Sequence, residues 1–202
     1  MLNHAPIGYV RTLAGDFVID PDEQVQMVVW SIFEQFTRRG SVNGLLVWLV
    51  RNDMKLPIRP HSGVSRGELQ WRRPNRATLL NMLHHPIYYG TYVYGRRKTD
   101  PKKVVKGSPN SGRVWTSSDQ WDVLIENKLP AYISKQRFED NQQKLWENAA
   151  KYRLGTAMRG TSMLAGRVVC GHCGRHMSVS YSGQSKERLT CEMSRNQWGE
   201  KQ

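Results

Sequence analysis

Residues 20–40 have the sequence DPDEQVQMVVWSIFEQFTRRG, which predicts one long amphipathic helix over about 22 to 39. Asp20 is placed to cap this helix, Pro21 suits its first position, and Glu23 stands where a capping-box carboxylate reaches back. The apolar side chains return at helical spacing, at Val25, Val28, Val29, Ile32, Phe33 and Phe36. Two arginines and Gly40 then supply the cations and the glycine that favour a helix end. We expect this helix to lie in the core.

Two shorter helices are expected next along the chain. Ser41 can cap the first of them after only a short turn. Its apolar face is Val42, Leu45, Leu46, Leu49 and Val50. The second runs roughly from Asn75 to His84 and is stopped by Pro86. Its inward side chains are Leu79, Leu80 and Leu83.

The pattern changes after this third helix. Tyr88 to Arg97 alternates aromatic and small residues and favours a strand or hairpin arm. A mobile loop rich in Lys, Gly, Pro and Ser is expected from there to Gly112. Ser134 can then cap a long helix to about Tyr152. The side chains expected to pack from this last helix are Phe138, Leu145, Trp146 and Ala149.

The charge balance indicates a polyanionic partner. Thirty Lys plus Arg against 17 Asp plus Glu give a formal net charge of +13, and the pI is near 10.0. Nucleic acid is the first partner that such a chain predicts, although a surface selected for solubility gives the same excess. The sequence has no run of about 18 apolar residues and no signal peptide at its start. We therefore expect a cytoplasmic protein with no membrane partner.

Three cysteines suggest a metal site rather than disulfides. Cys170 and Cys173 have the Cys-x-x-Cys spacing with glycines that is typical of a zinc knuckle, and Cys191 is the natural third ligand. Structural Zn²⁺ is favoured over redox chemistry, since a reactive dithiol is expected beside a βαβ pattern. The alternating residues between Cys173 and Cys191 predict a β-ribbon. No Cys or His follows Cys191, so either the ribbon continues beyond this sequence or the site is incomplete.

The order of these segments resembles the DNA-binding part of large serine recombinases, the phage integrase and transposase group. Four stretches carry the likeness. They are residues 5–9 (APIGY), Trp71 through Gly90, residues 126–134 (ENKLPAYIS), and Leu164-Ala165-Gly166 leading into Cys170–Gly174. In the second stretch the family has an NPxYxG pattern, and His85 stands here where that pattern usually has Asn.

The resemblance implies an α+β fold, in which a mixed helical and strand DNA-binding domain is followed by a small, truncated zinc β-ribbon. The expected parts are a recombinase domain at 1–152, a basic linker at 153–161 and a partial ribbon at 162–202. It implies recognition of attachment sites for DNA integration or excision, as a dimer on DNA and a tetramer in the synapse of the intact enzyme. The catalytic serine belongs to a separate N-terminal domain in this family, so no catalytic residue is assigned. The alternatives are a free-standing DNA-binding regulator and an RNA-binding protein.

Three groups of residues are the candidates for DNA contact. The outer side of the helix near 75–84 would present Arg72, Arg73, Asn75, Arg76, Thr78 and Asn81 to base edges in a major groove. The basic loop would reach phosphates through Arg96, Arg97, Lys98, Lys102 and Lys103. In the linker, Arg153 and Arg159 could lie along a minor groove. A solvated helix face, a merely soluble loop and a plain tether are the alternatives for the three groups.

Overall fold

The computed structural model describes residues 5–108, 111–116, 118–154, 162–164, 166–182 and 186–193. The α-helices are α1 Glu23–Arg39, α2 Val42–Arg51, α3 Arg76–Leu83 and α4 Lys135–Leu154. Short 3-10 helices are η1 Pro86–Tyr89, η2 Pro101–Lys103 and η3 Ser118–Gln120. The strands pair antiparallel, as β1 Tyr9–Arg11 with β2 Phe17–Ile19, β3 Leu56–Ile58 with β4 Gln70–Arg72, β5 Tyr92–Tyr94 with β8 Val123–Ile125, β6 Arg97–Thr99 with β7 Arg113–Trp115, and β9 Ser178–Ser182 with β10 Lys186–Thr190. This is the α+β class expected from the sequence.

Helix α1 has the predicted extent, but Asp22 caps it and not Asp20. The Asp22 carboxylate accepts hydrogen bonds from the amides of Gln24 at 2.8 Å and Val25 at 3.3 Å. Asp20 is buried and accepts instead from Arg59, with Nε to Oδ2 at 2.8 Å. The helix ends as expected at Gly40, whose φ of 68° lets its amide donate to the Phe36 carbonyl.

The core lies between the first three helices and β3. Helix α1 packs on α2, and α2 packs on α3. Ser41 caps α2 as predicted, since its Oγ accepts from the Gly44 amide at 3.1 Å. In α3, Leu79 and Leu83 are buried as expected, but Met82 takes the third buried position and Leu80 is only partly buried. The buried faces therefore follow the helical period that the sequence shows.

Three tyrosines connect the start of the chain to two later segments through hydrogen bonds. The Tyr9 hydroxyl lies 2.9 Å from the carbonyl of Ile87 and 2.8 Å from that of Pro130. Tyr132 donates to the Gly8 carbonyl at 2.6 Å, and Tyr88 donates to that of Ile7 at 2.8 Å. Burial raises the pKa of all three hydroxyls, which therefore remain donors at neutral pH. These hydrogen bonds bring the 5–9, 86–90 and 126–134 stretches into contact.

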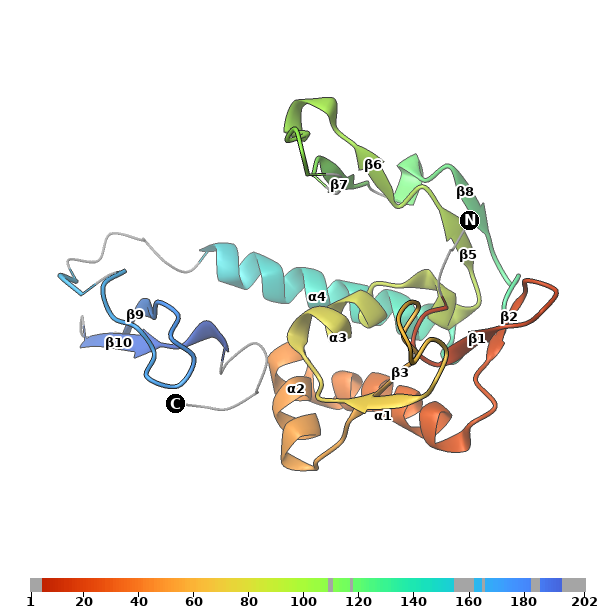
Figure 1. Ribbon diagram of the computed structural model, residues 1–202, viewed down its shortest axis with the longest axis horizontal. Coiled ribbons are helices and arrows are strands. Elements are labelled where there is room, and N and C mark those ends of the chain that lie inside the picture. Colours follow the sequence, from red (N-terminus) through yellow and green to blue (C-terminus); the bar gives the residue numbers. More distant parts are fainter. Residues whose placement is uncertain are drawn as a thin grey trace.

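The stretch from Tyr88 to Gly112 confirms the predicted hairpin arm at β5 but departs from the prediction on either side of it. Its first residues form the 3-10 helix η1 rather than a strand, and the expected loop contains β6, η2 and the start of β7. The β5–β8 and β6–β7 pairs follow one another to form a two-stranded arm, residues 92–125, that projects from the helices (Figure 1). Gly95 connects the two pairs at φ 85°, where a Cβ would lie 2.2 Å from the Asp122 carboxylate. Three-residue strands are too short to give a clear alternating pattern.

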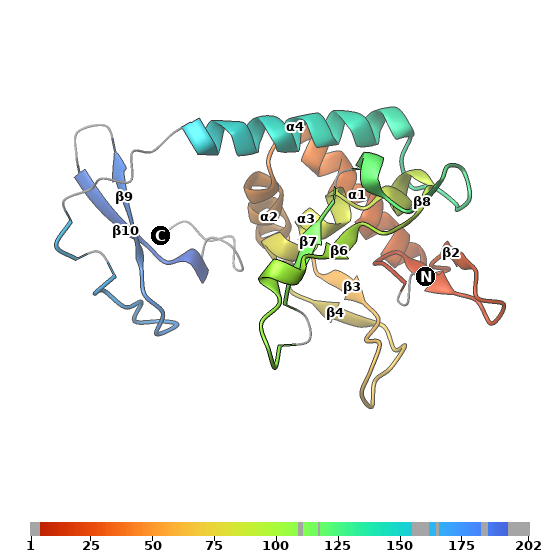
Figure 2. The same ribbon diagram turned by 90° about the horizontal axis from the view of Figure 1, so that it is seen from above.

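Helix α4 lies along the side of the molecule opposite the arm tip (Figure 2). Ile133 and Phe138 are buried, as a hydrophobic staple requires, and the Ser134 hydroxyl accepts from the Arg137 amide at 3.3 Å. Leu145 is buried as predicted. The prediction for Trp146 was wrong, because this side chain is 67% exposed, and Ala149 is exposed as well.

Candidate nucleic-acid interface and metal centre

Some of the candidates around α3 hold the helix in place, and others are exposed to solvent. Asn75 caps α3, since its Oδ1 accepts from the Thr78 amide at 2.9 Å, and Arg76 donates from Nε to Asn43 Oδ1 of α2 at 3.1 Å. Both side chains thus hold the start of the helix. Arg72, Arg73 and Asn81 are exposed. Arg72 contacts Gln70 Oε1 at 2.7 Å, an exposed bond that water or a ligand can replace.

The arm candidates divide in the same way. Arg96 is partly buried at the base of the arm and donates to the His84 carbonyl at 3.2 Å. Burial, with Arg97 nearby, lowers the pKa of Arg96 to about 10, so it remains a cation at neutral pH. Lys98 pairs with Asp122 at 3.0 Å, and Lys103 lies 3.7 Å from Asp100. Arg96 therefore anchors the arm, whereas the others line its surface.

The strand register shows which arm cations share a face. Arg97 lies opposite Trp115, Lys98 opposite Val114, and Thr99 opposite Arg113. Side chains that are directly opposite lie on the same face of a two-stranded sheet, and successive residues alternate. Arg97 and Arg113 therefore share one face, and Lys98 lies on the other, next to the carboxylate of Asp122.

A second projecting hairpin, formed by β3, β4 and the loop between them, was not predicted from the sequence. Arg59 holds its base by donating to Asp20 and to the Gly67 carbonyl, the latter at 3.0 Å. Arg66 and Val64 are exposed in its loop. The available signal was the pair of glycines, Gly63 and Gly67, which both take positive φ.

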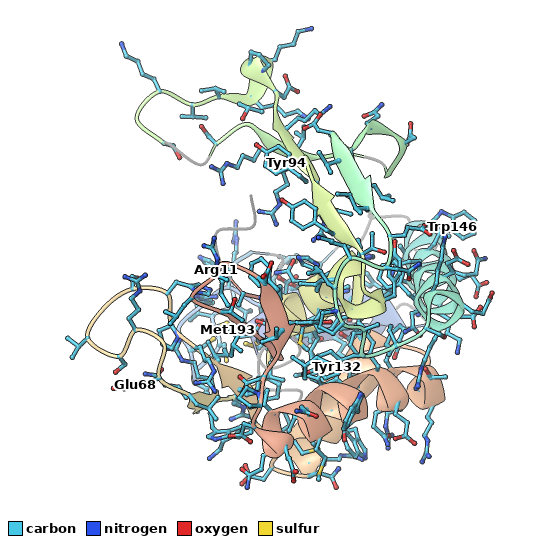
Figure 3. All side chains as sticks on the ribbon, turned by 90° about the vertical axis from the view of Figure 1, so that its right-hand side faces the viewer. Arg11, Glu68, Tyr94, Tyr132, Trp146 and Met193 are labelled. Atoms are coloured by element: carbon cyan, nitrogen blue, oxygen red, sulfur yellow. The ribbon has the colours of Figure 1, made fainter. Side chains whose placement is uncertain are left out.

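The two hairpins project in different directions, but both lie away from α4. In Figure 2 the arm tip and the β3–β4 loop both point away from α4. In Figure 3 the arm rises above the helices and the β3–β4 loop, marked by Glu68, points to the left, with Trp146 of α4 on the right. We call the side that carries the arm, the β3–β4 loop and β4 the hairpin side.

Helix α4, on the opposite side, carries both signs of charge, since Lys135 is exposed and Arg137 and Lys144 are partly exposed. Glu139, Asp140 and Glu147 of α4 are exposed near Trp146. The hairpin side presents Arg66, Arg72 and the arm cations, which outnumber its exposed carboxylates such as Glu68. This excess of exposed cations makes the hairpin side the candidate nucleic-acid interface.

The predicted cysteines meet at one point. The Sγ atoms of Cys170, Cys173 and Cys191 all lie within 4.8 Å of one another, and those of Cys173 and Cys191 are 3.4 Å apart. Thiolates about 2.3 Å from a tetrahedral metal are themselves about 3.8 Å apart, so the three sulfurs fit one ion. All three cysteines are free thiols, and they form the one such group of potential metal ligands in the described ranges.

The knuckle and the hairpin position these sulfurs. The Cys170 amide donates to the Arg175 carbonyl, and the Cys170 carbonyl accepts from the Gly174 amide, both at 2.8 Å. Gly174 has φ 68°, which closes the turn. The β9–β10 register, from Ser178 with Thr190 to Ser182 with Lys186, returns Cys191 to the knuckle and matches the predicted ribbon.

Of the two linker candidates, only the backbone of Arg153 lies in the described part of the chain. Helix α4 continues through Arg153 to Leu154, and the side chain of Arg153 is not described. Arg159 lies outside the described residues. Both stay predictions from the sequence.

Comparisons with known proteins match two parts of the chain to protein families. The Recombinase family matches residues 23–148. The chain belongs to the recombinase family. The recombinase zinc beta ribbon domain matches residues 163–198, across the cysteine cluster. Both matches agree with the resemblance to large serine recombinases that the sequence motifs suggested.

The relatives of this recombinase chain are longer. An "Uncharacterized protein y4bA/y4pH" of Sinorhizobium fredii (strain NBRC 101917 / NGR234) is 35% identical over 180 residues, which cover 87% of this chain and 25% of the relative. The chain thus spans a quarter of that protein's length. One similar solved chain comes from "Sequence Requirements of the Listeria innocua prophage attP site", with 15% identity, a TM-score of 0.46, and coverage of 93% of this chain and 64% of that one. Another comes from "Crystal Structure of a LSR-DNA Complex", with 15% identity, a TM-score of 0.45, and coverage of 96% and 50%.

A search for membrane-spanning segments gave no candidate. Over the part of the chain that the structure describes, no helix combines the length and the apolar character needed to cross a bilayer.

Proposed function

We propose that this chain is the DNA-recognition part of a site-specific serine recombinase, which binds duplex DNA at attachment sites for integration or excision. The observation that carries the proposal is the gathering of exposed arginines and lysines on β4, the β3–β4 loop and the arm, where they outnumber the exposed carboxylates. A duplex laid on the hairpin side would meet cations from β4, the β3–β4 loop and the arm together. Phosphate contacts from these elements would supply affinity and orientation.

The expected contacts differ in kind. Arg72, Arg73 and Asn81 are the exposed side chains near α3 that suit base edges, because Arg and Asn pair bidentately with guanine and adenine. Thr78 is a further base contact. Arg97, Lys98, Lys102 and Lys103 would bind phosphates. Asn75, Arg76 and Arg96 would act indirectly, by positioning the helix and the arm.

The metal in the ribbon is proposed to be structural Zn²⁺. Three thiolates are soft ligands, which zinc prefers in closed structural sites, and Cys170 and Cys191 are buried. When bound, the ion would supply the folding free energy of the ribbon. The proposal includes the division into 1–152, 153–161 and 162–202, with Arg153 and Arg159 following a minor groove between the two DNA-binding parts.

The proposed role of the chain is binding, with cleavage performed by the serine domain of the intact recombinase. There, two copies would bind one attachment site and four would meet in the synapse. We assign no catalytic residue to the described part of this chain.

The test is selection of a preferred duplex from a random pool, followed by titration of that duplex across a salt series. We expect one preferred half-site, tighter than random duplex and than RNA, with affinity that falls steeply as salt rises. Arg72→Ala with Arg73→Ala should weaken binding at least tenfold, since a bidentate base contact is worth about 1 to 3 kcal/mol. Lys144→Ala on α4 is the matched control and should change little. Equal binding to RNA and to all duplexes would contradict the proposal.

A further inference from the structure

The tip of the arm carries two exposed valines among lysines. Val104 and Val105 are 52% and 62% exposed, Lys103 precedes them and Lys106 follows them. A single exposed apolar residue is ordinary, but two adjacent β-branched side chains at the end of a projecting hairpin will meet a partner surface early. Figure 1 shows the arm leading away from the helices to this tip.

Hydrogen bonds fix the shape of the backbone around these valines. The Asp100 amide donates to the Gly112 carbonyl at 2.8 Å, and the Asp100 carboxylate accepts from the Lys102 amide at 3.0 Å. Ser111 Oγ accepts from the Val105 amide at 2.8 Å. Gly112 has φ 75°, and a Cβ there would lie 2.8 Å from Val104 Cγ2. Within residues 100–108 and 111–112 these bonds favour one backbone shape, and a preformed shape lowers the entropic cost of binding.

The charge around the two valines favours a polyanionic partner. Residues 96–113 hold seven Lys or Arg and one acid, Asp100, which lies 3.7 Å from Lys103 Nζ. An acidic protein surface and DNA both fit this charge. DNA is favoured because the arm lies on the hairpin side, together with Arg66 and Arg72 of the candidate interface.

The width of the arm favours the major groove of the DNA duplex over the minor groove. Two paired strands lie about 4.8 Å apart and need further room for their side chains. The major groove, about 12 Å wide, admits a two-stranded ribbon in undeformed B-DNA, whereas the minor groove, about 6 Å wide, takes one only when the duplex is deformed. The apolar group that base pairs present in the major groove is the C5-methyl of thymine.

We propose that the arm tip enters the major groove and that Val104 and Val105 pack against thymine methyl groups, so that the tip recognises thymine by apolar contact. Lys102 and Lys106 would bind the phosphates on either side. The inference rests on the proposed DNA-binding function and adds a specificity determinant to it. Loss of the valines should weaken binding to thymine-containing positions only.

The experiment replaces each thymine of the selected duplex, one at a time, with deoxyuridine, which lacks only the methyl group. We expect one or two positions at which deoxyuridine weakens binding of the intact chain about fourfold, the value of one buried methyl. Val104→Ser with Val105→Ser should bind the original duplex more weakly and should lose the difference between thymine and deoxyuridine at those positions. Both residues are exposed, so the variant is expected to keep its melting temperature.

The control variant is Val64→Ser, which changes the fully exposed valine of the β3–β4 loop. It should retain the sensitivity of the intact chain to deoxyuridine. Equal sensitivity in the double valine variant and the intact chain, or none at any position, would overturn the inference while leaving DNA binding in place. Reduced self-association with unchanged DNA affinity would also overturn it, in favour of a protein partner. Failure of the intact chain to bind any duplex would instead reject the proposed function.

Discussion

The helical body and the ribbon differ in how much they bury. The body has one apolar cluster that extends from Tyr9 to Leu145, with Phe33, Leu45 and Ile87 fully buried. Among the described residues of the ribbon, only Cys170 and Cys191 are buried. Small folds below about 40 residues usually need a metal or disulfides, because they cannot bury enough apolar surface. The body is therefore stabilised by packing, and we expect the ribbon to depend on a metal ion bound by its cysteines.

Removal of the metal should have the largest effect and should be confined to the ribbon. A chelator is expected to unfold β9 and β10, because a structural Zn²⁺ contributes on the order of 10 kcal/mol to folding. Amide hydrogen exchange should become fast in the ribbon and stay slow in α1. Cys170→Ser is expected to reproduce the result without chelator. Protection of β9 and β10 that survives both treatments would show that the ribbon folds without metal.

A substitution in the core should destabilise the helical body and leave the ribbon folded. Phe33→Ala removes a fully buried ring and is expected to lower the free energy of unfolding of the body by about 3 to 5 kcal/mol. Thermal or urea unfolding of the metal-loaded chain measures this loss. Trp30→Ala, on the same helix but 49% exposed, is the matched control and should cost less. Equal losses for the two variants would mean that burial in α1 does not determine the stability of the body.

Acid should also destabilise the body through His85. Burial, with Arg96 nearby, lowers the pKa of His85 to about 3, and its Nδ1 accepts from the Ile87 amide at 3.2 Å. Between pH 6.5 and about 3 the unfolded chain binds a proton that the folded chain does not, so stability falls as pH falls. The loss is at most about 1.4 kcal/mol for each pH unit in that window.

His85→Asn is the variant that isolates this effect. Asn keeps an oxygen that can accept from the Ile87 amide, and it does not titrate. The free energy of unfolding of the two proteins, measured from pH 7 to pH 4, should therefore diverge as the pH falls, with the variant more resistant to acid. Parallel curves would show that His85 titrates normally in the folded state.

The sequence predicted those features that depend on local patterns. The extents of α1 and α2 followed from apolar periodicity and from Ser41 and Gly40 at their ends. The cysteine cluster followed from the spacing of Cys170 and Cys173, since a chelating pair is local in sequence. The β9–β10 ribbon followed from alternation over five-residue strands.

Features that depend on distant residues were beyond local patterns. Asp20 and Asp22 are both suitable caps, and Arg59, which lies far along the chain, takes Asp20 away from that role. Trp146 follows the helical period of α4, but nothing local says that no element covers it. Likewise, Arg96 was grouped with its basic neighbours, although it anchors the arm on the His84 carbonyl.

Charge removal on the arm should have the smallest effect on stability and still change DNA binding. Arg97 and Arg113 share an exposed face of β6 and β7, where substitutions typically change the free energy of unfolding by less than about 0.5 kcal/mol. Arg97→Gln with Arg113→Gln should therefore melt like the parent. Its slope of log affinity against log salt should be shallower by about two, one for each lost phosphate contact. Lys135→Gln with Lys144→Gln on α4 removes the same number of charges and should leave that slope unchanged, and an equal change in both variants would mean that net charge, not the arm, determines binding.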